Sequence, residues 1–201
     1  MEQRTDEWYL VRAGKVTASN VYKVLSKGKG GADSKTRLSY MLELLGDRLE
    51  GFPAAGYQSE AMARGSELEP EARNAYSFEM GFIVNETGFV PHQKINNFGA
   101  SPDGLIEDDG LVEIKCPNRA THIDTLVNGT IDNKYYLQMQ TQLACTGRKW
   151  CDFVSYYPAL GENSLFIKRI EADQAMIAEI EQAVIKFLNE IDALERRINE
   201  R

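Results

Sequence analysis

Apolar residues recur every three or four positions in several parts of the chain, which is the spacing of one face of an α-helix. The pattern predicts helices over residues 36–49, 59–80 and 134–145, a short helix near 21–25 and a long one after Asp173. Thr17 or Ser19 is expected to cap the short helix. Gly65 and Pro70 predict a kink or a break within the helix at 59–80.

The middle of the chain has the pattern of strands. Strands are predicted over residues 82–90, 98–101, 105–107, 111–116, 150–157 and 165–170. The Asp108-Asp109-Gly110 turn predicts that the two strands beside it form a hairpin. The order of helices and strands predicts an α/β fold with a central mixed β-sheet flanked by helices, and the length predicts a single domain, 1–201.

Composition limits the class of site that the chain can build. The three cysteines are Cys116, Cys145 and Cys151, and no C-x-x-C occurs, so a disulfide framework or a cysteine-rich metal site is not expected. The two histidines, His92 and His122, lie 30 residues apart. A metal site would therefore depend on carboxylates, whose oxygens favour hard cations such as Mg²⁺ or Mn²⁺.

Charge is unevenly distributed along the chain. The net charge is −7, but residues 12–37 carry a local charge of +6 and residues 171–201 one of −4. The basic part is either an ordinary solvated surface or a surface for an anionic partner. The chain has no long apolar run and no apolar segment near residue 1, so neither membrane association nor a signal peptide is expected, and the expected compartment is cytoplasmic.

The segment Ser101-Pro102-Asp103-Gly104, followed after eight residues by Glu113-Ile114-Lys115, carries the candidate chemistry. Side chains alternate along a strand, so Glu113 and Lys115 share one face and Val112 and Ile114 the other. With Asp103 arriving from the neighbouring strand, two carboxylates could hold a divalent cation beside a lysine, as phosphodiester hydrolysis requires. The alternative is a hairpin with a surface Glu–Lys pair.

Four blocks in order distinguish these alternatives. They are Gln3…Asp6-Glu7-Trp8…Arg12-x-Gly14-x-x-Thr17-Ala18-Ser19, then Ala61-Met62-Ala63-Arg64-Gly65…Glu69-x-x-Ala72-Arg73, then Ser101-Pro102-Asp103-Gly104 with Glu113-Ile114-Lys115-Cys116-Pro117, then Tyr136-x-Gln138-x-Gln140. Together they resemble the phage lambda-type alkaline exonucleases and their YqaJ-like viral recombinase relatives, in the PD-(D/E)XK nuclease superfamily. The chain departs from the lambda-type pattern at Arg64, where that relative has Trp, and its C-terminal third matches only in the order of elements.

The resemblance implies a restriction-endonuclease-like fold and a role for several residues. Asp103, Glu113, the main-chain carbonyl of Ile114 and Glu69 are the implied metal ligands, for Mg²⁺ with Mn²⁺ able to substitute. Lys115 is the implied catalytic lysine, and Gln140 matches a glutamine that orients the lysine or the attacking water. The DNA-binding residues implied are Arg12 for the 5′-phosphate, Ser19 and Ser101 near a phosphate, Lys29 in the basic loop, and Met62 as an apolar wedge between the strands.

By this resemblance the protein is a metal-dependent 5′→3′ exodeoxyribonuclease of phage-type recombination, encoded by a phage or its bacterial host. It would act on linear double-stranded DNA ends with a 5′-phosphate, release mononucleotides and leave 3′ overhangs. A homotrimeric ring and a single-strand annealing protein are the implied partners. Two alternatives stay open, namely a PD-(D/E)XK endonuclease and a non-catalytic DNA-end-binding recombination protein.

Overall fold

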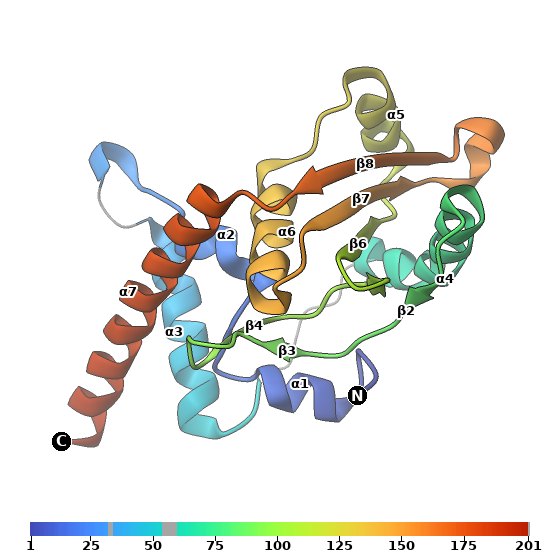
Figure 1. Ribbon diagram of the computed structural model, residues 1–201. Coiled ribbons are helices and arrows are strands. Elements are labelled where there is room, and N and C mark those ends of the chain that lie inside the picture. Colours follow the sequence, from blue (N-terminus) through green and yellow to red (C-terminus); the bar gives the residue numbers. More distant parts are fainter. Residues whose placement is uncertain (32–33, 54–59, 201) are drawn as a thin grey trace.

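A computed structural model describes residues 1–31, 34–53 and 60–200 (Figure 1). The helices are α1 (Asp6–Arg12), α2 (Val21–Val24), α3 (Lys35–Glu50), α4 (Glu60–Met80), α5 (Arg119–Asn128), α6 (Asn133–Thr146) and α7 (Gln174–Asn199). The strands are β1 (Val16–Thr17), β2 (Val84–Asn85), β3 (Val90–Pro91), β4 (Phe98–Ala100), β5 (Gly104–Ile106), β6 (Gly110–Lys115), β7 (Trp150–Tyr156) and β8 (Leu165–Glu171). Short 3₁₀ segments lie at Ala18–Asn20, Lys29–Gly31 and Pro158–Asn163.

The central sheet has the strand order β2-β5-β6-β7-β8. Its β6 and β7 strands are parallel and its other neighbours antiparallel, so the sheet is mixed. β5 and β6 form the hairpin that the Asp-Asp-Gly turn predicts. The predicted α/β class with a central mixed sheet is therefore confirmed.

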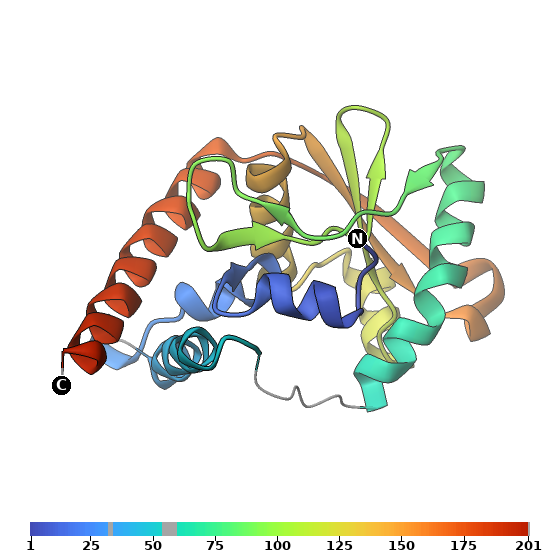
Figure 2. The same ribbon diagram turned by 90° about the horizontal axis from the view of Figure 1, so that it is seen from below.

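Helices cover both faces of this sheet. On one face Ala72 and Tyr76 of α4 pack against Val112 and Ile114 of β6. On the other face α6 packs its Met139 and Leu143 on Leu111, Cys151 and Phe153. Figure 2 shows the sheet between α4 on one side and α6 and α7 on the other. Residues of β6 that point away from α4 are thus covered by α6 instead of by solvent.

A second apolar cluster holds the N-terminal half against the long last helix. It joins α2, α3 and α7 with the small sheet β1-β4-β3, and Tyr40 stacks on Phe187 with ring centroids 5.7 Å apart. The apolar stripe that the sequence predicts on the final helix is buried there, at Ile180, Val184 and Ile191. This cluster holds β1 beside β4, the strand that Ser101 directly follows. None of the helices in the described ranges is long and apolar enough to cross a membrane.

Some predicted elements are wrong in detail. The expected strand at 82–90 is divided between β2, which joins the central sheet, and β3, which joins the small one. Gly88 lies between them, and a Cβ there would meet the main-chain oxygen of Met1 at 2.5 Å. The close approach of the N-terminal segment therefore requires a break in the strand.

The predicted break in the helix at 59–80 does not occur, since α4 runs through Pro70 as one helix of 21 residues, and the predicted kink is visible as a bend in α4 (Figure 2). Burial of Ala72 and Tyr76 against the sheet offsets the hydrogen bond that Pro70 cannot donate. Neither Thr17 nor Ser19 caps the short helix, because Asn20 precedes α2 and makes no side-chain cap. Helices α1 and α5 were not predicted, although Thr5 and Asn118 cap them by accepting hydrogen bonds from Trp8 and Thr121.

Candidate active site

The β5–β6 hairpin brings Asp103 and Glu113 together. Gly104 pairs with Val112, so the residue just before β5 lies beside the end of β6. Asp103 Oδ2 accepts a hydrogen bond of 2.7 Å from the main-chain N–H of Ile114. This bond fixes one carboxylate at the strand position next to the other.

Glu113 is fully buried and its carboxylate has three partners. Lys115 forms an ion pair with Oε1, Gln138 donates to Oε1 at 2.7 Å, and Gln142 donates to Oε2 at 2.5 Å. Gln138 and Gln142 are one turn apart on α6, so one helix face presents both amides to the strand. A buried carboxylate held from both sides has little freedom to rotate, which suits a ligand or a catalytic group.

The electrostatics of this cluster favour a cation. Burial raises the pKa of Asp103 well above its usual range, and the negative charge of Glu113 raises it further. Burial alone would lower the pKa of Lys115, but the carboxylates of Glu113 and Asp103 raise it above its ordinary value. Lys115 is therefore a cation at neutral pH, and one lysine does not compensate two buried carboxylates.

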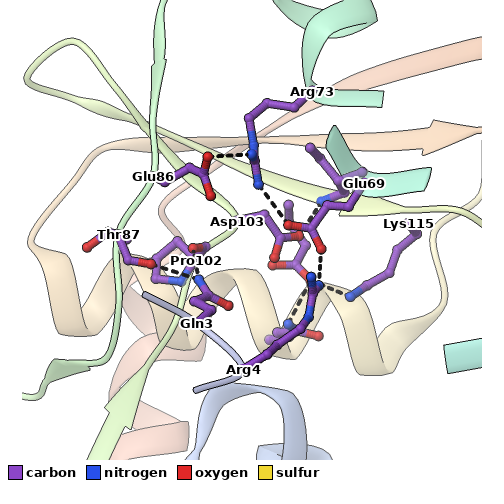
Figure 3. Close-up of polar contacts among 12 residues, drawn as sticks. Gln3, Arg4, Glu69, Arg73, Glu86, Thr87, Pro102, Asp103 and Lys115 are labelled. Atoms are coloured by element: carbon purple, nitrogen blue, oxygen red, sulfur yellow. Dashed lines mark hydrogen bonds and ion pairs between the residues drawn. The ribbon is translucent and has the colours of Figure 1, made fainter. Parts of the chain in front are cut away.

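Glu69 faces the same cleft from α4. Its Oε1 accepts a 2.8 Å hydrogen bond from Arg73, and its Oε2 binds Arg4 (Figure 3). Arg73 also pairs with Glu86 at 2.8 Å. Glu69 is thus positioned near Asp103, whose pKa it raises, while two guanidinium groups hold it in place.

The donor set of this cleft fits a hard divalent cation. Asp103 and Glu69 offer carboxylate oxygens in the cleft, and Ile114, which lines it, has a main-chain carbonyl. The buried Glu113 pairs with Lys115 beside them. Within the described ranges, no three His, Cys, Asp or Glu side chains are grouped so as to hold a metal by themselves. A cation there would therefore take further ligands from the main chain, water or substrate, as Mg²⁺ commonly does.

Asp103 and Glu69 line a cleft of about 880 Å³ between α4, α5 and the start of α6, while Glu113 is buried behind it. Cationic side chains line it beside the acids, namely Arg4, Arg64, Lys115 and Lys134. Lys115 Nζ also lies 5.0 Å from the ring centroid of Tyr135. This mixture of acids and cations suits a ligand that is itself anionic and that binds with a metal ion.

Arg12 lies in a second, smaller pocket of about 130 Å³. Its guanidinium stacks on Trp8 at 3.7 Å from the ring centroid, and its buried Nε has no hydrogen-bond partner among the described residues. Burial lowers the pKa of Arg12 to about 10. A buried guanidinium without a carboxylate partner is a fitting site for a phosphate.

Trp8 connects the two pockets. Its ring supports Arg12, and its Nε1–H donates a hydrogen bond of 3.0 Å to Ser101 Oγ. Ser101 precedes Asp103 by two residues, so Arg12 and the acidic cluster are joined through one side chain. Ser19 is exposed near this pocket, with its Oγ 3.3 Å from Thr17 Oγ1.

Two of the expected DNA-binding residues, Lys29 and Met62, are not placed at the site by the described side chains. Lys29 is exposed in the short 3₁₀ segment Lys29–Gly31. Met62 belongs to α4, but its side chain lies outside the described residues. The structure therefore groups Arg12 and Ser101 with the acidic cluster, and it does not bring Lys29 to them.

Gln140 does not reach the acidic cluster, which corrects the expectation for this residue. Its Nε2 donates to the carbonyl of Glu171 at 2.9 Å, and its Oε1 accepts from the N–H of Asp173 at 2.8 Å. Two residues along a helix turn the side chain by about 200°, so Gln138 and Gln140 point to opposite sides. Gln138 holds Glu113, while Gln140 ties α6 to the start of α7.

Gln142, Arg4 and Tyr135 also lie at the candidate site, although the sequence pattern did not predict them there. Gln138 and Gln142 are four residues apart on a predicted helix, and this spacing predicts that both side chains lie on the same face. Arg4 reaches the cleft only through long-range packing of the N-terminal segment, for which the sequence has no local signal.

A mixed sheet flanked by helices, with Asp103, Glu113 and Lys115 at one hairpin, defines a protein of the PD-(D/E)XK nuclease fold. The YqaJ-like viral recombinase domain model matches residues 7–149. The chain therefore belongs to the YqaJ-like viral recombinase family, and the resemblance seen in its ordered sequence blocks is confirmed.

Solved structures agree with this assignment. The chain is similar to the alkaline exonuclease LHK-Exo from Laribacter hongkongensis, at 49% identity and a TM-score of 0.91, over 98% of this chain and 97% of that one. A crystal structure of LHK-Exo in complex with dAMP matches equally well. A phage-related exonuclease from Haemophilus somnus, 19% identical, matches 92% of this chain and 96% of that one at a TM-score of 0.73, which shows the fold alone.

One curated protein is also similar. It is the uncharacterized protein R354 of Acanthamoeba polyphaga mimivirus, 28% identical over 166 residues. The match covers 76% of this chain but 29% of that protein, so the chain spans less than a third of this relative's length.

Proposed function

We propose that the protein is a Mg²⁺-dependent exonuclease that degrades one strand of linear duplex DNA from the 5′ end and releases mononucleotides. The observation that carries the proposal is the link from Arg12 through Trp8 to Ser101, beside Asp103. A phosphate-binding pocket next to an acidic site suits an enzyme that binds the terminal phosphate of a DNA strand and hydrolyses a phosphodiester bond close to it. The relative crystallised with dAMP supports a mononucleotide product.

The side chains have distinct roles in this proposal. Asp103, Glu113 and the carbonyl of Ile114 would hold Mg²⁺, and Glu69, which lines the same cleft as Asp103, would serve a second position. The metal supplies Lewis-acid activation of water and neutralises charge on the phosphate. Lys115, a cation at neutral pH, stabilises the negative charge that develops on the phosphate oxygens.

Gln138 and Gln142 keep Glu113 fixed during this reaction. Each amide donates one hydrogen bond to a different oxygen of the carboxylate. An amide is uncharged, so it orients the ligand without competing for the metal. The pair therefore acts as a positioning device and takes no proton in the reaction.

The proposal extends to the assembly. We propose that chain 1–201 acts as one nuclease domain, that three copies form a ring around the DNA, and that the 3′ overhang passes to a single-strand annealing protein. A ring retains DNA by topology, which suits a chain with a net charge of −7. The exposed lysines between residues 12 and 37, namely Lys27, Lys29 and Lys35, would then face the DNA.

The test uses linear duplex DNA labelled at the 5′ or the 3′ end, with a closed circle as a control, in Mg²⁺ or Mn²⁺. We expect rapid release of 5′-labelled mononucleotide and an intact circle. Release from the 3′ end would contradict the polarity. A cut circle would indicate an endonuclease, and binding to ends without cleavage in either metal would indicate a non-catalytic protein.

A further inference from the structure

The N-terminal segment 1–5 is fixed against the active-site strands. Gln3 Nε2 donates hydrogen bonds of 2.8 Å to the carbonyls of Thr87 and Pro102. Pro102 is the residue before Asp103, and the main chain of Met1 packs closely on Gly88. Figure 3 shows Gln3 between Thr87 and Pro102, with Arg4 next to it in the cleft. The segment therefore places its fourth residue beside the acidic cluster.

Arg4 has a backbone conformation that is costly for an arginine. Its φ is +67°, in the left-handed region that favours glycine. Such a conformation costs about 1 kcal/mol or more, and non-glycine residues in it are concentrated at functional sites. The anchor at Gln3 and the helix cap at Thr5 hold this conformation from both sides. Because glycine would be more stable at this position, the arginine side chain is expected to have a function that offsets the conformational cost.

The ion pair with Glu69 does not explain why an arginine occupies this position. Arg73 already bonds the carboxylate of Glu69 from one turn along the same helix. Arg4 binds the other oxygen through one guanidinium nitrogen, and its side chain is 44% exposed where it lines the cleft. A guanidinium has five N–H donors, and a pair of them matches two oxygens of a phosphate.

The other cations that line the cleft also have partners, although the buried Nε of Arg64 has none among the described residues. Arg64 donates to the carbonyl of Cys116 at 3.2 Å, Lys115 pairs with Glu113, and Lys134 pairs with Asp132. Arg4 differs from them because it shares its carboxylate partner with Arg73, so it can leave Glu69 without leaving that carboxylate unpaired. It is the cation best placed to exchange its contact for an anionic ligand.

We propose that Arg4 binds a backbone phosphate of the DNA strand in the cleft, by exchanging its contact with Glu69 for a bidentate contact with that phosphate. The proposal rests on the proposed function, because it takes DNA to be the ligand of the cleft. Arg4 is then a substrate-binding residue, separate from Arg12, which lies in the other pocket. Gln3 is the positioning residue that delivers it.

The test begins with Arg4→Gly. Glycine adopts a φ of +67° without strain, so this substitution removes the side chain and preserves the backbone, and the melting temperature should be unchanged or higher. Two controls match it. Glu107→Gly changes an exposed residue with a φ of +44°, and Arg197→Ala removes one positive charge at the end of α7.

The affinity for a 5′-phosphorylated duplex is measured with Ca²⁺ in place of Mg²⁺, and the cleavage rate with Mg²⁺. We expect Arg4→Gly to raise the Kd roughly tenfold, since a charged hydrogen bond to phosphate is lost. Arg4→Lys should bind more tightly than Arg4→Gly and less tightly than the wild type, because lysine keeps the positive charge but cannot form the bidentate contact. Both controls should bind as the wild type does.

A set of duplexes with one neutral methylphosphonate each identifies the contact. At one position the wild type should lose as much affinity as Arg4→Gly does, and the two proteins should bind that duplex equally. An equal effect of Arg4→Gly at every position, or no effect, would overturn the proposal. Faster cleavage by Arg4→Gly would also overturn it, because Arg4 would then be an inhibitory contact on Glu69.

Failure of the proposed function has a different signature. If the wild type neither binds nor cleaves any of these duplexes, the assignment of DNA as the ligand is wrong, and the role of Arg4 falls with it. If the wild type binds and cleaves while Arg4→Gly is indistinguishable from it, the role of Arg4 alone is wrong.

Discussion

Gln138 of α6 donates a hydrogen bond of 2.7 Å to the buried carboxylate of Glu113 on β6, 25 residues earlier in the chain. Glu113 faces α6 and has no exposure to solvent. Hydrogen bonds to both oxygens of a buried carboxylate keep it oriented. The relationship makes α6 part of the proposed active site as well as a cover for the sheet.

The two glutamines of the Gln138-x-Gln140 pair should therefore respond differently to substitution. Gln138→Leu leaves Glu113 without one of its donors, and we expect kcat to fall between about 10-fold and 100-fold, as for outer-shell ligands of metals. Gln140→Leu breaks contacts with Glu171 and Asp173, so we expect a lower melting temperature with kcat retained. Steady-state cleavage and thermal unfolding of both variants measure this contrast. Equal loss of kcat in both would contradict the placement.

Asp103→Asn should separate activity from stability. Asparagine can still accept the hydrogen bond from Ile114, but it removes one of two repelling buried charges. We expect cleavage to fall roughly 10³-fold, while the melting temperature in EDTA rises by about 3 °C. Mg²⁺ should raise the melting temperature of the wild type and not that of the variant, because a bound ion stabilises only the protein that holds it. An unchanged response to Mg²⁺ in the variant would remove Asp103 from the metal site.

Substitution of Asp152 should have the opposite effect, lowering the stability while the activity is retained. It is fully buried on β7, where Tyr76 donates to it at 2.7 Å and Arg169 holds both oxygens at 2.8 Å. Asp152→Asn breaks this ion pair on the α4 face of the sheet, and we expect about 2 kcal/mol of lost stability, or roughly 5 °C in melting temperature. Cleavage at 25 °C should persist, since these residues do not line the cleft. A variant that stays folded and loses activity would show that the α4 face takes part in the reaction.

Local pattern accounts for the elements and for the core of the site. The alternation along residues 111–116 puts Glu113 and Lys115 on one face, and the Asp-Asp-Gly turn brings Asp103 beside them. Both inferences need only the period of a strand and the chemistry of a turn. The sequence does not say that this face is buried, because α6 covers it from a distance of some 25 residues.

The wrong or missing predictions concern features that depend on packing between segments far apart in the sequence. The pattern at 82–90 is apolar enough for one strand, but contact with Met1 at Gly88 divides it between two sheets. The choice between Gln138 and Gln140 depends on how α6 is rotated toward the sheet, which neither glutamine reveals alone. Arg4 reaches Glu69 across 65 residues of sequence, so only the folded structure shows it at the site.

Arg12 should determine the preference for a phosphorylated end. Its stacked, buried guanidinium has an Nε without a partner among the described residues, and its pKa is lowered to about 10 by burial, so a phosphate there gains a full ionic contact. Arg12→Ala should reduce the ratio of kcat/KM for 5′-phosphate over 5′-hydroxyl duplexes by about 10-fold to 100-fold. Trp8→Phe retains an aromatic ring for Arg12 and removes the hydrogen bond to Ser101, so it should lower kcat more than it changes this ratio. Cleavage of both duplexes by both variants provides the measurement. Equal loss on the two ends in Arg12→Ala would show that Arg12 supports the fold and does not bind the terminal phosphate.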